Sequence, residues 1–380
     1  MPYTTPKVTY SATYNGGFAQ LSGVQSATVT RGRQYFQDNF SGSQCNVELI
    51  AADSYTLPLA VGQWLELRET TSQYSPCYFS GRITDVNRTY GMKYDSGTGA
   101  APSDRIFITA VGATGMLGTT NGVSSTMGAI AAPVAMSAIC TANSVSSVLY
   151  GTTGATVQAK TYINYKALDL INEMARTGQA FIDDFDTSRT QRQTAVIFAN
   201  SGTGRVATFT DNGTTGDEVF KYNKIEYQSS VQTAFTQVAV TPTGLATQSA
   251  QTGSAPYASL NYQTLNSSTD DALNLATYLL SLNSQASITP FMITTDTNIQ
   301  PSASIIPRLF NGVAYGYPIG SQVTVTFRGT TVYAQLQGIT ANFYPDYMSV
   351  RLTLSPSIGT PFTLNSTAFG VLDTNRLGFS

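Results

Sequence analysis

The feature that most constrains this chain is a strand pattern that occurs twice, about 260 residues apart. The first copy has a glycine and an alternating strand at 62–68, a polar gap, and a second strand at 77–84 that ends in Gly-Arg-Ile-Thr. The second copy has the same layout at 320–327 and 332–340, and it ends in Gly-Ile-Thr. Two distant copies of one β-unit predict two related β-barrels with other material between them, and the alternative is a chance similarity between alternating strands.

The spacing of glycines supports the repeat. Gly62 and Gly81 are 19 residues apart, and Gly320 and Gly338 are 18 residues apart. A further strand pattern follows each copy, Arg-Ile-Phe-Ile-Thr-Ala-Val from residue 105 and Met-Ser-Val-Arg-Leu-Thr-Leu from residue 348. The repeated unit is therefore expected to contain at least three consecutive strands.

The composition indicates several domains and broad polar surfaces. A chain of 380 residues exceeds what one ordinary core holds, so two to four domains are expected. Charged residues make up only 11% of the chain, and Ser, Thr, Gly, Asn, Gln and Tyr take their place. The net charge of −2 argues against a surface that grips nucleic-acid phosphates. The 22 tyrosines fit β-cores and subunit interfaces, with carbohydrate binding as the alternative.

Histidine is absent from the sequence, and this excludes whole classes of catalytic site. Ser-His and Cys-His nucleophiles, imidazole metal ligands and imidazole proton shuttles all need it. Cys45, Cys77 and Cys140 form no CxxC pair, and an odd number cannot complete an internal disulfide framework. Buried thiols are therefore expected, and no cofactor or metal is predicted.

The N-terminal residues lack the basic start and apolar core of a signal peptide. The most apolar stretch, residues 128–140, contains Pro133 and is too short to span a membrane. We therefore expect no membrane span and assembly in a cytoplasm.

Between the two copies the pattern changes. Residues 113–160 suggest a long irregular connection, or a short buried helix over 127–140 that Pro133 interrupts. Residues 165–176 predict a helix with one apolar face and Gly178 as its stop, followed by strands near 180–184, 194–198 and 205–209.

A second helix is expected later in the chain. Ser268 and Asp271 form a variant of the capping box, which predicts a helix from Asp271 to about Asn283. Leu273, Ala276, Leu279 and Leu280 would form its apolar face.

The densest acidic cluster, residues 183–186, predicts a solvated hairpin turn, because it lacks the glycine and terminal Glu of a calcium loop. Glu173 and Asp183 are a conceivable pair of glycosidase carboxylates, but the predicted helical face of Glu173 gives that idea no support.

Several segments resemble baseplate-hub proteins of long-tailed phages, often called minor tail proteins. Residues 29–49 carry an Arg-Gly-Arg strand end, a small-residue turn and a strand, and residues 57–67 resemble the entry to the family's next strand. Residues 81–86 and 106–111 continue the likeness, residues 338–356 resemble the family's closing strand pair, and residues 372–379 resemble its terminal arm.

The resemblance implies a fold that is mainly β with α+β insertions: two related β-barrel domains plus inserted small α+β modules. The expected domains are a first barrel (1–112), an inserted α+β domain (113–222), a second barrel (223–360) with a helical insertion near 268–285, and a C-terminal docking arm (361–380). The apolar arm residues expected to contact a neighbour are Phe369, Leu372, Leu377 and Phe379.

The resemblance also implies a function, a structural protein of the virion at the tail tip. Three chains would form a homotrimer ring that closes the tail tube and anchors distal spike or receptor-binding proteins. Its partners would be the distal tail or tube ring, the tape measure and spike or fibre proteins, with DNA only in transit through the lumen. No catalytic residues are implied. The alternatives are a distal tail protein that forms a hexameric ring, a receptor- or glycan-binding tail protein, and a hydrolytic tail enzyme.

Overall fold

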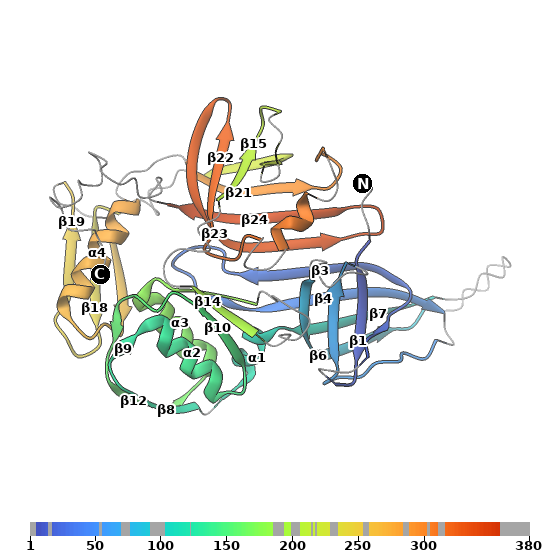
Figure 1. Cartoon of the computed structure of the whole chain (residues 1–380), viewed down its shortest axis with the longest axis horizontal. Coiled ribbons are helices and arrows are strands. Elements are labelled where there is room, and N and C mark those ends of the chain that lie inside the picture. The colour runs from blue at the N-terminus through green and yellow to red at the C-terminus, as the bar shows by residue number, and fades with distance from the viewer. Residues whose placement is uncertain are drawn as a thin grey trace.

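The fold is organised around one sheet of 14 strands (Figure 1). The computed structural model describes residues 5–13, 17–52, 55–69, 77–91, 103–121, 123–184, 194–198, 206–213, 216, 219–228, 235–253, 258–283, 289–301, 305–310 and 316–357.

The first seven strands form what we name the first unit. They are β1 (Lys7–Ser11), β2 (Ala19–Gln20), β3 (Val24–Gly32), β4 (Ser41–Ala52), β5 (Trp64–Arg68), β6 (Cys77–Thr89) and β7 (Ser103–Val111). Their order in the sheet is β3-β4-β7-β6-β5-β1-β2.

The other seven strands form the second unit. They are β15 (Val206–Thr210), β16 (Val219–Lys221), β17 (Lys224–Gln228), β21 (Thr289–Asp296), β22 (Gln322–Phe327), β23 (Thr330–Phe343) and β24 (Met348–Pro356). Their order is β17-β21-β24-β23-β22-β15-β16, which repeats the first unit strand for strand along the chain. Among these strands only β1 and β15 differ in direction, since β1 runs antiparallel to β5 whereas β15 runs parallel to β22.

The repeat extends to individual hydrogen bonds. Gly62 and Gly320 both have positive φ, and each donates its N–H to the neighbouring strand, to the carbonyl of Ile83 in the first unit (2.8 Å) and of Leu336 in the second (2.7 Å). One residue further along, β6 and β23 each carry a β-bulge, at Thr84 and Gln337. A bulge inserts one residue into one strand and bends it, so both units bend at the same place.

The two units are joined by an antiparallel pairing of β3 with β23. The first part of β23 pairs with β22, and its second part, from Gly338 to Phe343, pairs with β3. In Figure 1 the blue strands β3 and β4 therefore continue the layer of the orange and red strands of the second unit.

In each unit the two outermost strands of the sheet follow one another in the sequence. A short connection leads from β2 into β3, and another leads from β16 into β17. Among the described strands, neither of these pairs is hydrogen-bonded, so neither unit is a closed barrel.

An α+β module follows β7. It contains α1 (Ala113–Thr119), β8 (Val123–Met127), β9 (Ile130–Ala131), α2 (Ala132–Ala142), β10 (Ser146–Tyr150), β11 (Thr156–Val157), β12 (Lys160–Tyr165), α3 (Ala167–Gly178), β13 (Phe181–Asp183) and β14 (Thr194–Phe198). Its main sheet has the order β10-β14-β13, and the green helices α2 and α3 lie close together in Figure 1.

The irregular connection expected over 113–160 is therefore wrong, because this stretch forms two helices and several strands. Pro133 lies in the first turn of α2 and begins the helix rather than interrupting it, because the missing N–H of proline has no partner there in any helix. The helix predicted at 165–176 is confirmed as α3. It ends at Gly178, and Gln179 takes the left-handed conformation (φ 51°).

A second module lies between β17 and β21. It contains β18 (Gln237–Pro242), β19 (Gln248–Gln251), β20 (Ser259–Thr264) and α4 (Thr269–Asn283), with the sheet order β19-β18-β20. Its apolar core is separate from the main core and takes in Phe36 from the β3–β4 connection. The Ser268 cap is confirmed, since its hydroxyl accepts from the Asp271 N–H (3.1 Å), but Leu273 is exposed and Ala272 and Leu275 are buried instead.

Two further placements complete the fold. Val206–Thr210 and Val219–Lys221, which the sequence assigned to the inserted domain, form β15 and β16 of the second unit. The short 3-10 helix η1 (Ile306–Phe310) places Phe310 edge-on against Tyr78 of β6, with ring centroids 5.2 Å apart.

Candidate assembly interface

The arm residues Phe369, Leu372, Leu377 and Phe379 lie outside the described residues, as does all of 361–380. The candidate interface is therefore built from the contact between the two units, which shows how this chain joins one unit to another.

The β3–β23 contact combines strand pairing with matched side chains. The Thr28 hydroxyl donates to Oδ1 of Asn342 across the strands (2.9 Å). The Arg33 N–H donates to the carbonyl of Gln337 (2.8 Å), and its Nε donates to Oε1 of the same residue (2.7 Å). The residue at the bulge, Gln337, thus binds the chain at the end of β3 through two hydrogen bonds.

Two glycines permit this close approach. Gly32 has φ +84°, and a Cβ there would overlap the backbone of Gln337 and Gly338. A Cβ on Gly338 would lie 2.5 Å from the carbonyl oxygen of Arg33. Both positions therefore favour glycine, because the two backbones are in contact.

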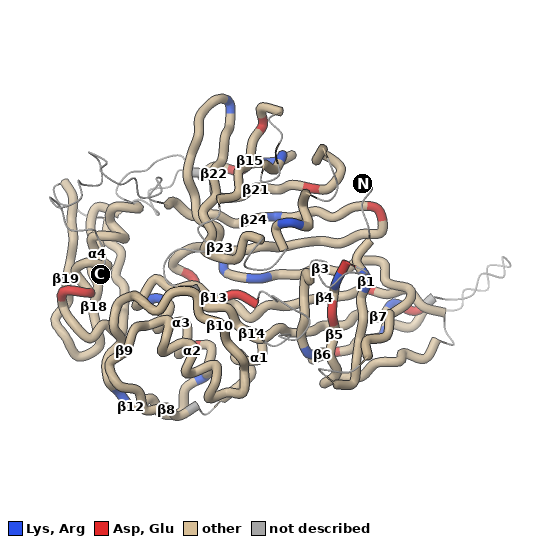
Figure 2. Tube along the Cα trace, in the orientation of Figure 1, with Lys and Arg blue, Asp and Glu red and all other residues tan. Residues whose placement is uncertain are grey.

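A buried ion pair connects this contact to the inserted module. Arg31 of β3 lies 3.4 Å from Asp183 of β13, and the two side chains are 2% and 0% exposed. The other carboxylate oxygen of Asp183 accepts from the N–H of Ile319 (3.0 Å), just before β22. Figure 2 shows this acidic position of β13 beside the basic end of β3.

Asp184, which is half-buried, forms a second link, from the end of β13 to α1. Its carboxylate accepts from the N–H of Thr114 (2.8 Å), from the Thr114 hydroxyl (2.9 Å) and from the Ser43 hydroxyl. Burial raises the pKa of Asp184 to about 6, against the lowering effect of these hydrogen bonds. The solvated hairpin expected at 183–186 is therefore wrong for Asp183 and Asp184, which fix the module to both units; Phe185 and Asp186 lie outside the described residues.

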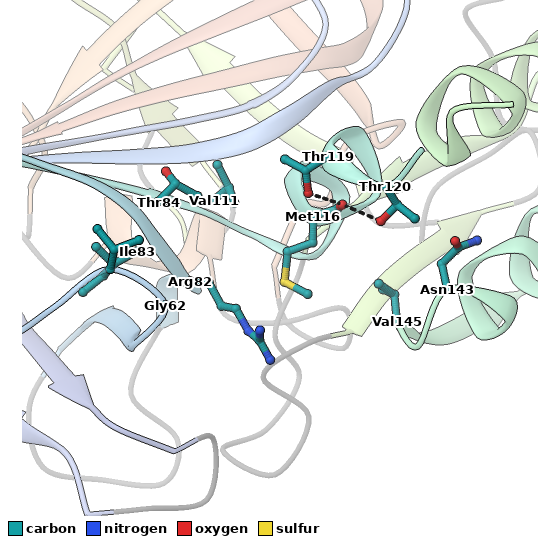
Figure 3. A pocket seen from close by; sticks show the side chains of 11 residues that line it. Gly62, Arg82, Ile83, Thr84, Val111, Met116, Thr119, Thr120, Asn143 and Val145 are labelled. Carbon is teal, nitrogen blue, oxygen red and sulfur yellow. Dashed lines mark hydrogen bonds between the residues drawn. The ribbon is translucent and has the colours of Figure 1, made fainter. Parts of the chain in front are cut away.

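A cavity of about 340 Å³ opens beside the bulge of the first unit (Figure 3). Its lining comes from the Gly62 corner, β6, the end of β7, α1 and the end of α2, and includes Arg82, Thr84, Met116 and Asn143. At the corresponding corner of the second unit, the Phe181 ring covers Gly320, where a Cβ would lie 2.7 Å from the ring. The cavity beside Gly62 in the first unit is therefore open, whereas the Phe181 ring occupies the corresponding place in the second unit.

The acidic side chains and thiols singled out in the sequence can be placed in the structure. No group of three or more Cys, Asp or Glu side chains in the described part of the chain could hold a metal. Asp183 is engaged with Arg31 and Ile319, and burial raises the pKa of Glu173 on α3. Cys45, Cys77 and Cys140 are buried and free, as expected. Among the described helices, none has the length and apolar character needed to cross a bilayer.

No protein-family model and no curated protein sequence matches this chain. Solved structures do match its fold. The 43 kDa tail protein of prophage MuSo2 from Shewanella oneidensis has a TM-score of 0.62 at 12% identity, and the match covers 92% of this chain and 98% of that protein.

Two further structures are similar. A tail protein from Neisseria meningitidis MC58 has a TM-score of 0.61 at 11% identity, covering 93% of this chain and 97% of that one. An Escherichia coli component of the type VI secretion system, described as similar to bacteriophage T4 tail proteins, has a TM-score of 0.52 at 10% identity and covers 88% and 74%. The chain thus resembles these two tail proteins in fold over nearly its whole length.

Proposed function

We propose that this chain is a structural protein of a phage tail tip that forms a homotrimeric hub ring. The observation that carries the proposal is the repeated strand order of the first and second units. The likeness in fold to two tail proteins, each matched over more than nine-tenths of its length, supports it.

The trimer follows from a geometric argument. A tail tube built from six-membered rings presents six similar surfaces at its end. Three chains match all six surfaces only if each chain offers two related faces, and the two units supply them. Contacts that join unlike faces of neighbouring copies close into a ring when the rotation allows it.

In this ring the first and second units would serve as the two barrel domains, with the walls of each completed by assembly. The module after β7 and the module between β17 and β21 would decorate the ring. Weakly charged surfaces rich in Thr and Tyr suit such contacts, because a buried charge without a partner is costly.

The partners in this proposal are the distal tail or tube ring on one side and the spike or fibre proteins on the other. The tape measure and DNA would pass through the lumen. The C-terminal arm, with Phe369, Leu372, Leu377 and Phe379, would pack on a neighbouring chain. The protein would be assembled in the host cytoplasm and would reside at the tail tip of the virion.

The proposal assigns no catalysis to the chain. The absence of histidine and the structural use of Asp183 support this. Clearing of host cell wall by the purified protein, lost in Asp183→Asn or Glu173→Gln, would show instead that it is a hydrolase.

The decisive experiment is a count of copies in each particle. Three copies per tail, together with a purified mass of three times 40.5 kDa, are expected. Six copies in one ring would favour a distal tail protein, and specific binding of host-wall sugars would favour a receptor-binding protein.

A further inference from the structure

We propose that β17 of one copy pairs, antiparallel, with residues 85–90 of a second copy, which are the end of β6 and the residue that follows it. This inference rests on the proposed ring and names the strands that would close it. It comes from the repeat itself: within the chain, β3 pairs with β23, and β17 and β6 are the counterparts of these two strands.

The accepting edge belongs to β6. β5 pairs with β6 only as far as Arg82, and beyond the bulge β7 is the only described strand beside it. The counterpart stretch of β23, residues 338–343, lies after the matching bulge and carries β3 on this side. Residues 85–90 of the first unit thus form a strand edge whose counterpart in the second unit, residues 338–343, is paired with β3.

The donating edge belongs to β17. β17 pairs with β21 as β3 pairs with β4, and it has no other strand beside it in the described part of the sheet. The other side of β3 is the side that pairs with β23. Each copy therefore has two different unpaired strand edges in its described sheet, one at β17 and one at the end of β6. A closed ring of unlike contacts requires two such edges on every copy.

Exposure follows the same division. Phe343, in the covered unit, is 3% exposed, whereas its counterpart Tyr90 is 72% exposed. Ala27 of β3 is buried, whereas its counterpart Ile225 of β17 is half-buried. The proposed contact between copies would therefore bury apolar side chains, Tyr90 and Ile225, that one copy alone leaves exposed or half-buried.

The register can be deduced residue by residue. Because Thr28 faces Asn342 within the chain, their counterparts Glu226 and Thr89 should face each other between copies. The neighbouring pairs would be Ile225 with Tyr90 and Tyr227 with Arg88.

The chemistry of these pairs is compatible with that register. The Thr28 hydroxyl donates to the Asn342 side chain within the chain (2.9 Å), and the Thr89 hydroxyl can donate to the Glu226 carboxylate in the same way. Arg88 would lie across from the ring of Tyr227, an arrangement that favours a cation–π contact.

Disulfide trapping tests the register. Thr89→Cys and Glu226→Cys are placed in two differently tagged copies of the full chain, which are co-expressed and mildly oxidised. Native Cys45, Cys77 and Cys140 are buried, and burial raises the pKa of Cys140 to about 12, so the background is low. The matched control is Thr84→Cys with Glu226→Cys, since Thr84 lies five residues from Thr89, or about 17 Å along the strand.

We expect a mixed-tag dimer band at least about tenfold stronger for the 89/226 pair than for the 84/226 pair, because a disulfide requires Cα atoms within about 7 Å. A trimer by sedimentation without the 89/226 band would overturn the strand pairing and leave the hub proposal standing. A monomer at every concentration, with no band, would overturn both. An equal band for both pairs would overturn the deduced register.

Discussion

Arg31 and Asp183 form an ion pair, 3.4 Å long, at the point where the first unit, the second unit and the inserted module meet. Both side chains are almost fully excluded from solvent. A buried charge that loses its partner costs far more than an exposed one, so this pair gives a direct test of the junction.

Asp183→Ala is expected to lower the free energy of unfolding by about 3–5 kcal/mol, because Arg31 loses its buried counter-ion. Arg105→Ala is the control, since it removes a 3.5 Å pair with Glu48 in which the Arg105 side chain is 63% exposed, and it should cost under about 1 kcal/mol. Urea unfolding measures both. Equal losses in the two variants would contradict the structural role of Asp183.

Asp184 predicts a specific pH dependence. Its pKa in the fold is about 6, above the ordinary value of 3.8, so the folded protein binds the proton more tightly than the unfolded chain. The resulting stabilisation is full below pH 3.8 and is lost as the pH rises through 6. The stability of the wild type minus that of Asp184→Asn should therefore fall by about 2 kcal/mol between pH 4 and 7.

Thermal unfolding of both proteins across this range measures the difference, and the titrations they share cancel. A difference that stays constant or grows with pH would show that the pKa of Asp184 is not raised.

Two glycines with similar φ separate backbone strain from crowding. Gly32 (φ +84°) lies against the backbone of β23, whereas Gly329 (φ +81°) has open space around it. Gly329→Ala should cost about 1–2 kcal/mol from the left-handed conformation alone. Gly32→Ala should cost about 1–3 kcal/mol more, because the two units must move apart. Equal losses in denaturant unfolding would mean that the β3–β23 contact adapts freely.

Deletion of residues 361–380 is expected to leave a folded protein that assembles poorly, because the apolar residues of the arm show no period that would fit them to their own domain. Circular dichroism and thermal unfolding report the fold, and sedimentation reports assembly. Loss of cooperative unfolding in the deletion would show that the arm belongs to the core of its own chain.

Much of the fold could be predicted from strand patterns, but the alignment of the repeat could not. The sequence matches Gly81 with Gly338, whereas the hydrogen bonds match Ile83 with Leu336 and place Gly338 at the position of Asp85. Glycine is favoured at these two positions for different reasons. Gly81 lies against the backbone of Val111 in its own unit, and Gly338 lies against β3 of the other unit.

The helices of the inserted module show a second limit. α3 has a polar and an apolar face, so its period is visible in the sequence, and the predicted apolar face is buried through Leu168, Ile171, Met174 and Ala175. α2 is apolar on most sides and rich in alanine, so it shows no such period. The contacts of Asp183 and Asp184 were also hidden, because their partners Arg31 and Thr114 are distant in sequence.

The pairing of β3 with β23 has a consequence for synthesis of the chain. Gly32 pairs with Gly338, which is synthesised about 300 residues later. A ribosome needs roughly 15–60 s to add that length, so β3 cannot pair with β23 before then. During that time the edge of β3 is a strand edge without its partner, which is a known route to aggregation. A host cell that makes this protein must therefore protect a nascent chain whose first unit is complete long before its neighbour exists.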